Sequence, residues 1–259
     1  MCLILTHSCV FFLCTNFGLM PLAKNIILKG DFFMSQMFEK FSDVTPLAWG
    51  IFAAIVVLSI IGLVFLSKKQ ESTTSTLLTK KLVYGGICIA ISFVLSYIRL
   101  FKMPQGGSIT PASMFPLVLY SMIFGPVSGV IAGIAYGFLQ VIQDPSICHP
   151  VQLLLDYPLA FGCIGLAGLA PQSIKNLHIR TSLAICLAFI GRCTMHVISG
   201  VIFFAEFAPE GMNPIIYSII YNGSFLLVEL VITLVLAIIV CATPIYVTMK
   251  KGASPSYNI

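Results

Sequence analysis

The sequence contains very little charge. Only 9% of its 259 residues are Asp, Glu, Lys or Arg, whereas 58% are hydrophobic. An ordinary soluble domain carries roughly 25% charged residues. No soluble core could enclose this many apolar side chains, so the composition excludes a soluble protein and indicates a polytopic membrane protein.

Common catalytic and metal-binding motifs are also missing. There is no HExxH or GxSxG motif, and the nine cysteines form no CxxC pair or metal-ligand spacing. Most of the cysteines lie in apolar runs, as small buried hydrophobic residues do. Without a GxxxxGK[ST] phosphate loop, the chain cannot power transport by hydrolysing nucleotide itself. We therefore expect a protein that is not an enzyme and that uses no cofactor or metal.

The sequence does contain long apolar runs. A helix needs about 20 mostly apolar residues to cross a bilayer. We expect an all-α fold, a six-helix transmembrane bundle, formed by residues 82–98, 112–124, 127–143, 150–169, 181–204 and 214–246. A further run over residues 46–67 predicts one extra N-terminal transmembrane helix.

The other segments complete the predicted organisation. Residues 1–45 form an N-terminal segment. Within it residues 1–20 are apolar but interrupted, and they fit a further span, a signal-like segment, or translation from a start upstream of the true one at Met34 or Met37. Residues 68–81 predict a polar cytoplasmic linker, 82–251 the six-helix domain, and 252–259 a cytoplasmic tail.

The net charge of +5 is unevenly distributed. In a six-span bundle most basic residues fall on one side, namely Lys68, Lys69, Lys80, Lys81, Lys175, Arg180, Lys250 and Lys251. The opposite side receives only Arg99 and Lys102 from short loops. The positive-inside rule then places the C-terminus in the cytoplasm, and it explains the basic balance without nucleic-acid binding.

Three polar side chains lie at a similar depth in the predicted bundle. At about 1.5 Å per helical residue, Asp156 lies roughly 9 Å from the outer end of its helix, and His196 and Asn222 about 12 Å from theirs. Considered singly, each of these residues also has a purely structural explanation. Asp156, for example, could form a hydrogen bond within a helix that is kinked at Pro158. Because buried carboxylates usually face a cavity and a partner, the shared depth predicts an outward-opening pocket.

Aromatic residues lie at or above this level, namely Tyr157, Tyr217, Tyr221, Phe203 and Phe204. A carboxylate, aromatic rings and an amide suit a cationic, planar, aromatic ligand. Arg192 and Glu229 lie deeper, and we interpret them as a structural ion pair.

Four blocks of sequence carry a family resemblance: "MPQGGSITPASMFPL", "LLLDYPLAFGCIGLAG", "RCTMHVISGVIFFAEFAPEGMNP" and "YSIIYNGSFLLVE". In this order, on six spans, they resemble the thiamine-specific substrate-capture subunits of energy-coupling-factor (ECF) vitamin transporters. The resemblance covers residues from about 81 to 251 and excludes the first 70 or so.

The resemblance implies a thiamine-binding subunit in the bacterial plasma membrane, with an outward pocket closed by the loop after the first helix. It implies binding by Asp156, Tyr157, His196, Tyr217 and Asn222. Two positions depart from the family pattern. Asp156 stands where glutamate is expected, and Phe204 where a stacking tryptophan is expected, because Trp49 lies outside the matching region.

The resemblance also implies partners: a transmembrane coupling protein and two ABC ATPases. Gly86 and Ala90, four residues apart on the first helix, match the surface where such subunits dock. Two alternatives stay open. The same architecture could capture another vitamin or a thiamine precursor. An intramembrane enzyme could use Asp156 and His196 as acid and base, although a second catalytic group is missing.

Overall fold

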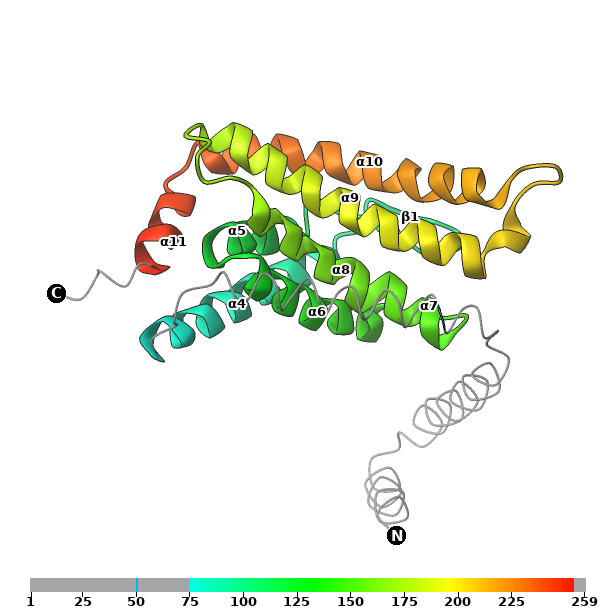
Figure 1. Cartoon of the computed structure of the whole chain (residues 1–259), viewed down its shortest axis with the longest axis horizontal. Coiled ribbons are helices and arrows are strands. Elements are labelled where there is room, and N and C mark those ends of the chain that lie inside the picture. The colour runs from blue at the N-terminus through cyan, green and yellow to red at the C-terminus, as the bar shows by residue number, and fades with distance from the viewer. Residues whose placement is uncertain (1–49, 51–74, 254–259) are drawn as a thin grey trace, which may run out of the picture. The chain divides into compact units, whose positions relative to one another are not determined.

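The computed structural model describes residues 50 and 75–253. The expected segments 1–45 and 46–67, and most of the linker, lie outside the described residues. The described chain is helical apart from one small hairpin (Figure 1). In chain order the elements are α4 (Ser75–Ser96), β1 (Phe101–Lys102), β2 (Ser108–Ile109), α5 (Phe115–Phe124), α6 (Pro126–Gln143), α7 (Pro150–Leu154), η1 (Leu155–Leu159), α8 (Ala160–Gly162), η2 (Cys163–Leu169), α9 (Leu177–Phe203), η3 (Ala205–Phe207), α10 (Pro214–Cys241) and α11 (Ile245–Ala253).

The predicted all-α membrane bundle is confirmed. Five helical runs of the described residues are long and apolar enough to cross a membrane, namely Ser75–Ser96, Pro126–Gln143, Pro150–Leu169, Leu177–Phe203 and Pro214–Cys241. The sixth predicted helix, α5, is short, and most of its residues are buried. A helix buried nearly all round lies inside the bundle, which explains why α5 is apolar on every face.

Two helix ends differ from the prediction. The first helix begins at Ser75, so residues 75–81, expected as linker, form its opening turns. The last predicted span, 214–246, is two helices, because α10 ends at Cys241 and α11 begins at Ile245. Pro244 lies at this break, and proline cannot continue a helix because it lacks an N–H and its ring clashes with the preceding turn. α11 then extends to Ala253, into the expected tail.

A ridge of glycines brings α6 against the segment that carries Asp156. The ridge consists of Gly129, Gly133 and Gly137, one helical turn apart. A Cβ added to Gly133 would lie 2.2 Å from the carbonyl oxygen of Phe161, and one at Gly137 would lie 2.7 Å from that of Tyr157. Such small residues let membrane helices approach to backbone contact. The position of Tyr157 is therefore set by backbone packing.

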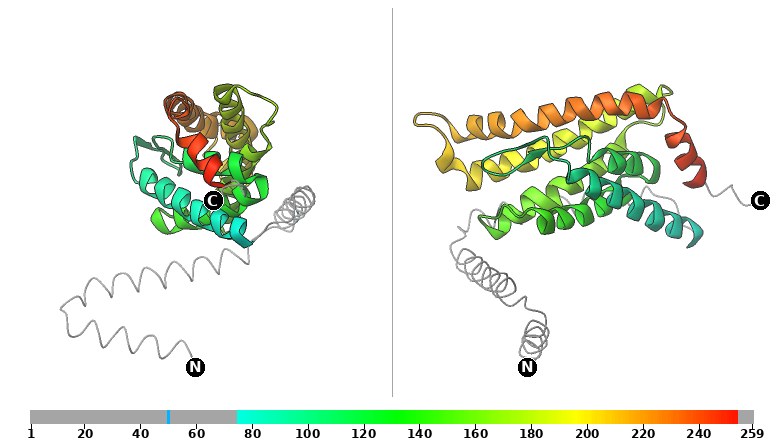
Figure 2. Two further views of the ribbon diagram at one scale, coloured as in Figure 1. Left: turned by 90° about the vertical axis from the view of Figure 1, so that its left-hand side faces the viewer. Right: turned by 180° about the vertical axis from the view of Figure 1, so that it is seen from behind.

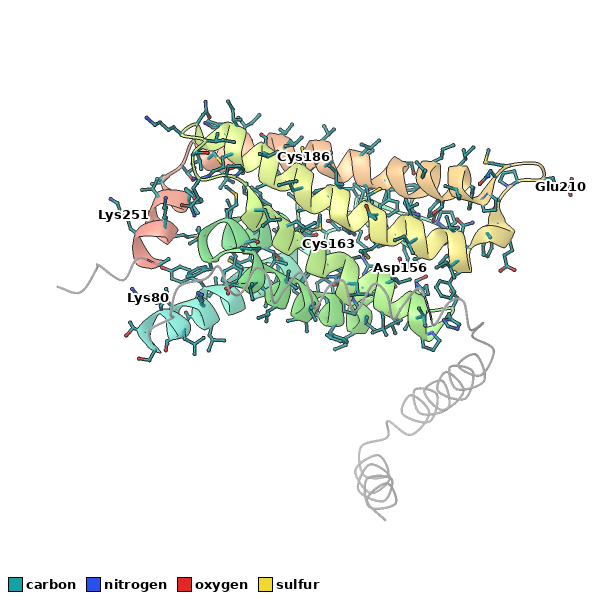
Figure 3. All side chains as sticks on the ribbon, in the orientation of Figure 1. Lys80, Asp156, Cys163, Cys186, Glu210 and Lys251 are labelled. Atoms are coloured by element: carbon teal, nitrogen blue, oxygen red, sulfur yellow. The ribbon has the colours of Figure 1, made fainter. Side chains whose placement is uncertain are left out.

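The long helices α9 and α10 pack side by side, with α11 turning away at one end (Figures 1 and 2). Figure 3 shows Lys80 and Lys251 at that same end of the bundle, whereas Glu210 lies at the opposite end and Asp156 in the half nearer to it. Asp156 therefore lies away from the end that carries Lys80 and Lys251.

Candidate functional site

A cavity lies between α9, α10, the η1 turn and the β1–β2 hairpin. Its volume is about 930 Å³ with the open mouth included. All six residues expected to bind ligand line it: Asp156, Tyr157, His196, Phe204, Tyr217 and Asn222. The structure thus brings together side chains from η1, α9 and α10 that are far apart in the sequence.

Asp156 lies in a widened helical turn. Pro158 has no N–H to donate and cannot continue a regular α-helix. The N–H of Ala160 donates to the carbonyl oxygen of Leu155, five residues back, which is the bond of a π-turn. Such turns are frequent at functional sites. Here the turn contains both Asp156 and Tyr157 and presents them to the cavity.

Asp156 is held by three side chains. Its Oδ1 lies 2.8 Å from His196 Nδ1, and its Oδ2 accepts hydrogen bonds from Gln152 Nε2 at 2.6 Å and Ser199 Oγ at 2.8 Å. The Asp156 side chain is 15% exposed. These bonds fix the orientation of a carboxylate that still borders the cavity.

The predicted Arg192–Glu229 ion pair is present, at 2.8 Å between Nη1 and Oε2, with the Glu229 side chain 1% exposed. The interpretation of the pair as purely structural was too narrow, because Arg192 also lines the cavity and its Nε donates to His196 Nε2 at 3.2 Å. Thr110, from the loop after the hairpin, donates to the other oxygen of Glu229.

These contacts determine the tautomer of His196. A guanidinium can only donate, so Nε2 of His196 is the acceptor and the ring proton lies on Nδ1, where it donates to Asp156. His196 is therefore neutral in this arrangement. The connected cluster contains two carboxylates and one guanidinium, so the cluster itself carries one negative charge beside the aromatic rings, whereas Arg99, Lys102 and Asp144 together carry one positive charge at the mouth.

One face of α10 supplies aromatic rings and an amide. Tyr217, Tyr221 and Phe225 follow each other at one-turn intervals. The ring centroids of Tyr217 and Tyr221 are 6.0 Å apart, and those of Tyr221 and Phe225 are 6.4 Å apart. Within the described part of the chain, every side-chain hydrogen bond of Asn222 is made by Nδ2, to Ser218 and to the carbonyl oxygen of His196. The amide oxygen of Asn222 is thus available as an acceptor.

The β1–β2 hairpin covers the cavity, as expected of the loop after the first helix. The backbone N–H of Gln105 donates to the Tyr221 hydroxyl at 2.9 Å, which in turn donates to the carbonyl oxygen of Gly106 at 3.1 Å. Gly107 has φ +90°, and a Cβ there would lie 2.9 Å from Phe225. Glycine is required because the turn is left-handed and lies directly on an aromatic ring.

The ring and the hydroxyl group of Tyr157 have different roles. Its ring borders the cavity, while its hydroxyl accepts from the Ser146 N–H at 2.8 Å and donates to the Asp144 carbonyl oxygen at 3.1 Å. The hydroxyl therefore fixes the α6–α7 loop. At the mouth, the Asp144 carboxylate pairs with Arg99 at 2.6 Å and Lys102 at 2.8 Å.

Gln152 and Ser199 were not predicted from the sequence, and Arg192 was predicted only as part of an ion pair. Gln152 precedes Asp156 by one turn, Arg192 precedes His196 by one turn, and Ser199 follows His196 by three residues. Side chains at these spacings lie on one helical face, so the i, i+3 and i, i+4 rule could have found all three. No comparable signal marks Gln105, whose position depends on the hairpin.

The predicted docking residues lie elsewhere. Gly86 and Ala90 are exposed on α4, outside the lining of the cavity. A Cβ at Gly86 would meet no atom within 4 Å. Gly86 therefore makes no close packing contact with the described part of the chain, and exposed apolar side chains such as Leu82 and Ile87 lie beside it on α4.

Comparisons with known proteins identify relatives of the chain. The thiamine transporter protein family matches residues 82–248. The chain is similar to thiamine transporter ThiT of Bacillus subtilis (strain 168), with 34% identity over 173 residues, covering 62% of this chain and 88% of that protein. ThiT of Lacticaseibacillus paracasei is 30% identical over 155 residues, covering 54% and 77%. A solved structure of ThiT from Listeria monocytogenes superposes with a TM-score of 0.56 at 25% identity, covering 64% of this chain and 96% of that one.

Proposed function

The chain belongs to the thiamine transporter protein family, and we propose that it is a thiamine-capture subunit of an ECF importer whose ligand lies in the cavity beside Asp156. Thiamine is a cation with two planar aromatic rings, an aminopyrimidine and a positively charged thiazolium, joined by a methylene group. The observation that carries the proposal is the cluster of Asp156, His196, Arg192 and Glu229, which leaves one negative charge beside aromatic rings. That charge complements the positive thiazolium ring.

Each lining residue has a proposed role. Asp156 faces the positive ring, and the ring of Tyr157 lies beside it. Aromatic faces attract cations, so Phe204 and Tyr217 stack on or border the ligand. The amide oxygen of Asn222 accepts a hydrogen bond from an amino group on the ligand, and His196 holds the Asp156 carboxylate in place.

The proposed transport cycle needs partners. The cavity opens to the outside, the C-terminus lies in the cytoplasm, and the exposed strip at Gly86 and Ala90 on α4 packs against a transmembrane coupling protein. Two ABC ATPases bound to that protein supply the energy, because this sequence has no phosphate loop of its own. Two small residues four positions apart favour close helix packing.

Titration of the Asp156→Asn variant tests the charge match. Loss of the carboxylate charge is expected to weaken thiamine binding more than tenfold, or about 1.4 kcal/mol, in calorimetric titrations of the purified protein. Glu210→Gln is the matched control, since it removes one carboxylate from an exposed loop outside the cavity lining. Equal affinities in Asp156→Asn and the parent would assign Asp156 a structural role only.

A further inference from the structure

A second hollow lies at the lysine-rich end of the bundle, near Lys251 in Figure 3. It is formed by the start of α9, the residues just before it, and α11. Four of its lining residues are cations: Lys175, Arg180, Lys250 and Lys251. All of its lining residues are described by the structure, and none of them is acidic. We refer to these residues as the basic groove.

Arg180 is the buried cation of the basic groove, at 8% exposure. Its Nη2 donates to the Tyr246 hydroxyl, and its guanidinium carbon lies 5.2 Å from the centroid of the Tyr246 ring. Among the described residues, no carboxylate forms an ion pair with it. A guanidinium has five N–H donors, and a buried charge without a counter-charge is costly. An anion from outside the described chain would offset that cost.

Tyr246 can contribute to anion binding as well. Its hydroxyl oxygen accepts from Arg180, which leaves its own proton to be donated. Burial raises the pKa of Tyr246 above its ordinary value, so the hydroxyl keeps this proton at neutral pH. A hydroxyl and a guanidinium thus form one donor pair at the base of the groove.

Apolar side chains flank the basic groove. Val247 on α11 is 48% exposed, and Ile179 on α9 is 58% exposed. α11 therefore carries exposed apolar residues together with Lys250 and Lys251 on one short helix, the pattern of a helix that lies in the membrane interface. A free inorganic anion would use only the charges, whereas a lipid would also cover the apolar side chains.

We propose that the basic groove binds the phosphate headgroup of an anionic phospholipid. Arg180, Lys250 and Lys251 contact the phosphate oxygens, and the acyl chains run past Ile179 along α9. Charged hydrogen bonds to phosphate are strong, and basic pockets at the ends of membrane helices bind such headgroups. The proposal concerns the end of the bundle opposite the thiamine cavity and does not depend on its ligand.

Native mass spectrometry of the full chain, released from detergent micelles with equal amounts of phosphatidylglycerol and phosphatidylcholine, tests the proposal. The parent should retain phosphatidylglycerol preferentially. The double variant Lys250→Gln/Lys251→Gln should lose that preference by about tenfold or more, since each basic residue near an anionic headgroup contributes strongly. The control Lys80→Gln/Lys81→Gln removes two charges from the same end, outside the groove lining, and should bind like the parent.

Three results would overturn the proposal: equal retention of both lipids by the parent, equal loss in the two double variants, or displacement of phosphatidylglycerol by an equal concentration of inorganic phosphate. The last would assign the groove to a free anion. Arg180→Gln should abolish the preference too. If that variant does not fold, the lysine variants still decide, with an unchanged thermal unfolding temperature as the check on their fold.

Discussion

The buried pair Arg192–Glu229 allows stability and binding to be separated. Arg192→Met should leave the Glu229 carboxylate without its counter-charge, at 1% exposure. Removing one partner of such a pair typically costs about 3–5 kcal/mol. For a protein of this size, about 2–4 °C of melting temperature is lost per kcal/mol, so we expect a decrease of roughly 6–20 °C.

The double variant Arg192→Met/Glu229→Met should recover most of that loss. Replacing both ions of a buried pair with apolar side chains is often neutral or stabilising. Thr110 would lose Glu229 as acceptor but keeps Ser113 Oγ at 2.8 Å. Thiamine affinity should not recover, because Nε2 of His196 would still lack the Arg192 donor that fixes the ring. A loss of about tenfold, or 1.4 kcal/mol, is expected.

Thermal unfolding in detergent and calorimetric thiamine titration measure the two effects. Arg99→Met is the matched control, since it removes an arginine from an ion pair whose side chains are 26% and 34% exposed. Ion pairs near the surface contribute about 0–1 kcal/mol, so the melting temperature of this variant should change little. The reasoning would be refuted by an Arg192→Met variant as stable as the control, or by a double variant no more stable than Arg192→Met.

Three further changes probe other parts of the molecule. Phe204→Ala should weaken thiamine binding by roughly 0.5–2 kcal/mol. Phe204→Trp should bind thiamine as tightly as the parent or more tightly, because indole is the better cation–π partner. If calorimetry gives Phe204→Ala the same affinity as the parent, Phe204 is not part of the site. Gly137→Ala should lower stability by about 1–3 kcal/mol through its clash with the Tyr157 carbonyl, whereas Gly223→Ala, with no atom within 4 Å of its Cβ, should unfold at a temperature close to the parent's. Gly86→Leu should retain thiamine affinity but fail to co-purify with the coupling protein; intact co-purification would place docking elsewhere.

Depth along helices was enough to predict part of the site. Asp156, His196 and Asn222 were placed at a similar level from helical rise and orientation alone, and all three line one cavity. Depth says nothing about which face of a helix a residue occupies, so the contact of Arg192 with His196 was missed. The i, i+4 spacing of Arg192 and His196 indicates that they lie on the same face of the helix and can be in contact.

The hairpin and the last helix were harder to predict. The β1–β2 hairpin has strands of two residues each, and it is held largely by contacts such as that of Gln105 with Tyr221. No local pattern specifies contacts between residues so far apart. The break before α11 had a local signal in Pro244, which the strong apolar run around it obscured.

Calorimetric titration of the purified full chain with thiamine tests the central proposal most directly. The account predicts saturable binding of one thiamine per chain, weakened more than tenfold in Asp156→Asn and unchanged in Glu210→Gln. Absence of saturable thiamine binding by the folded parent protein would contradict it.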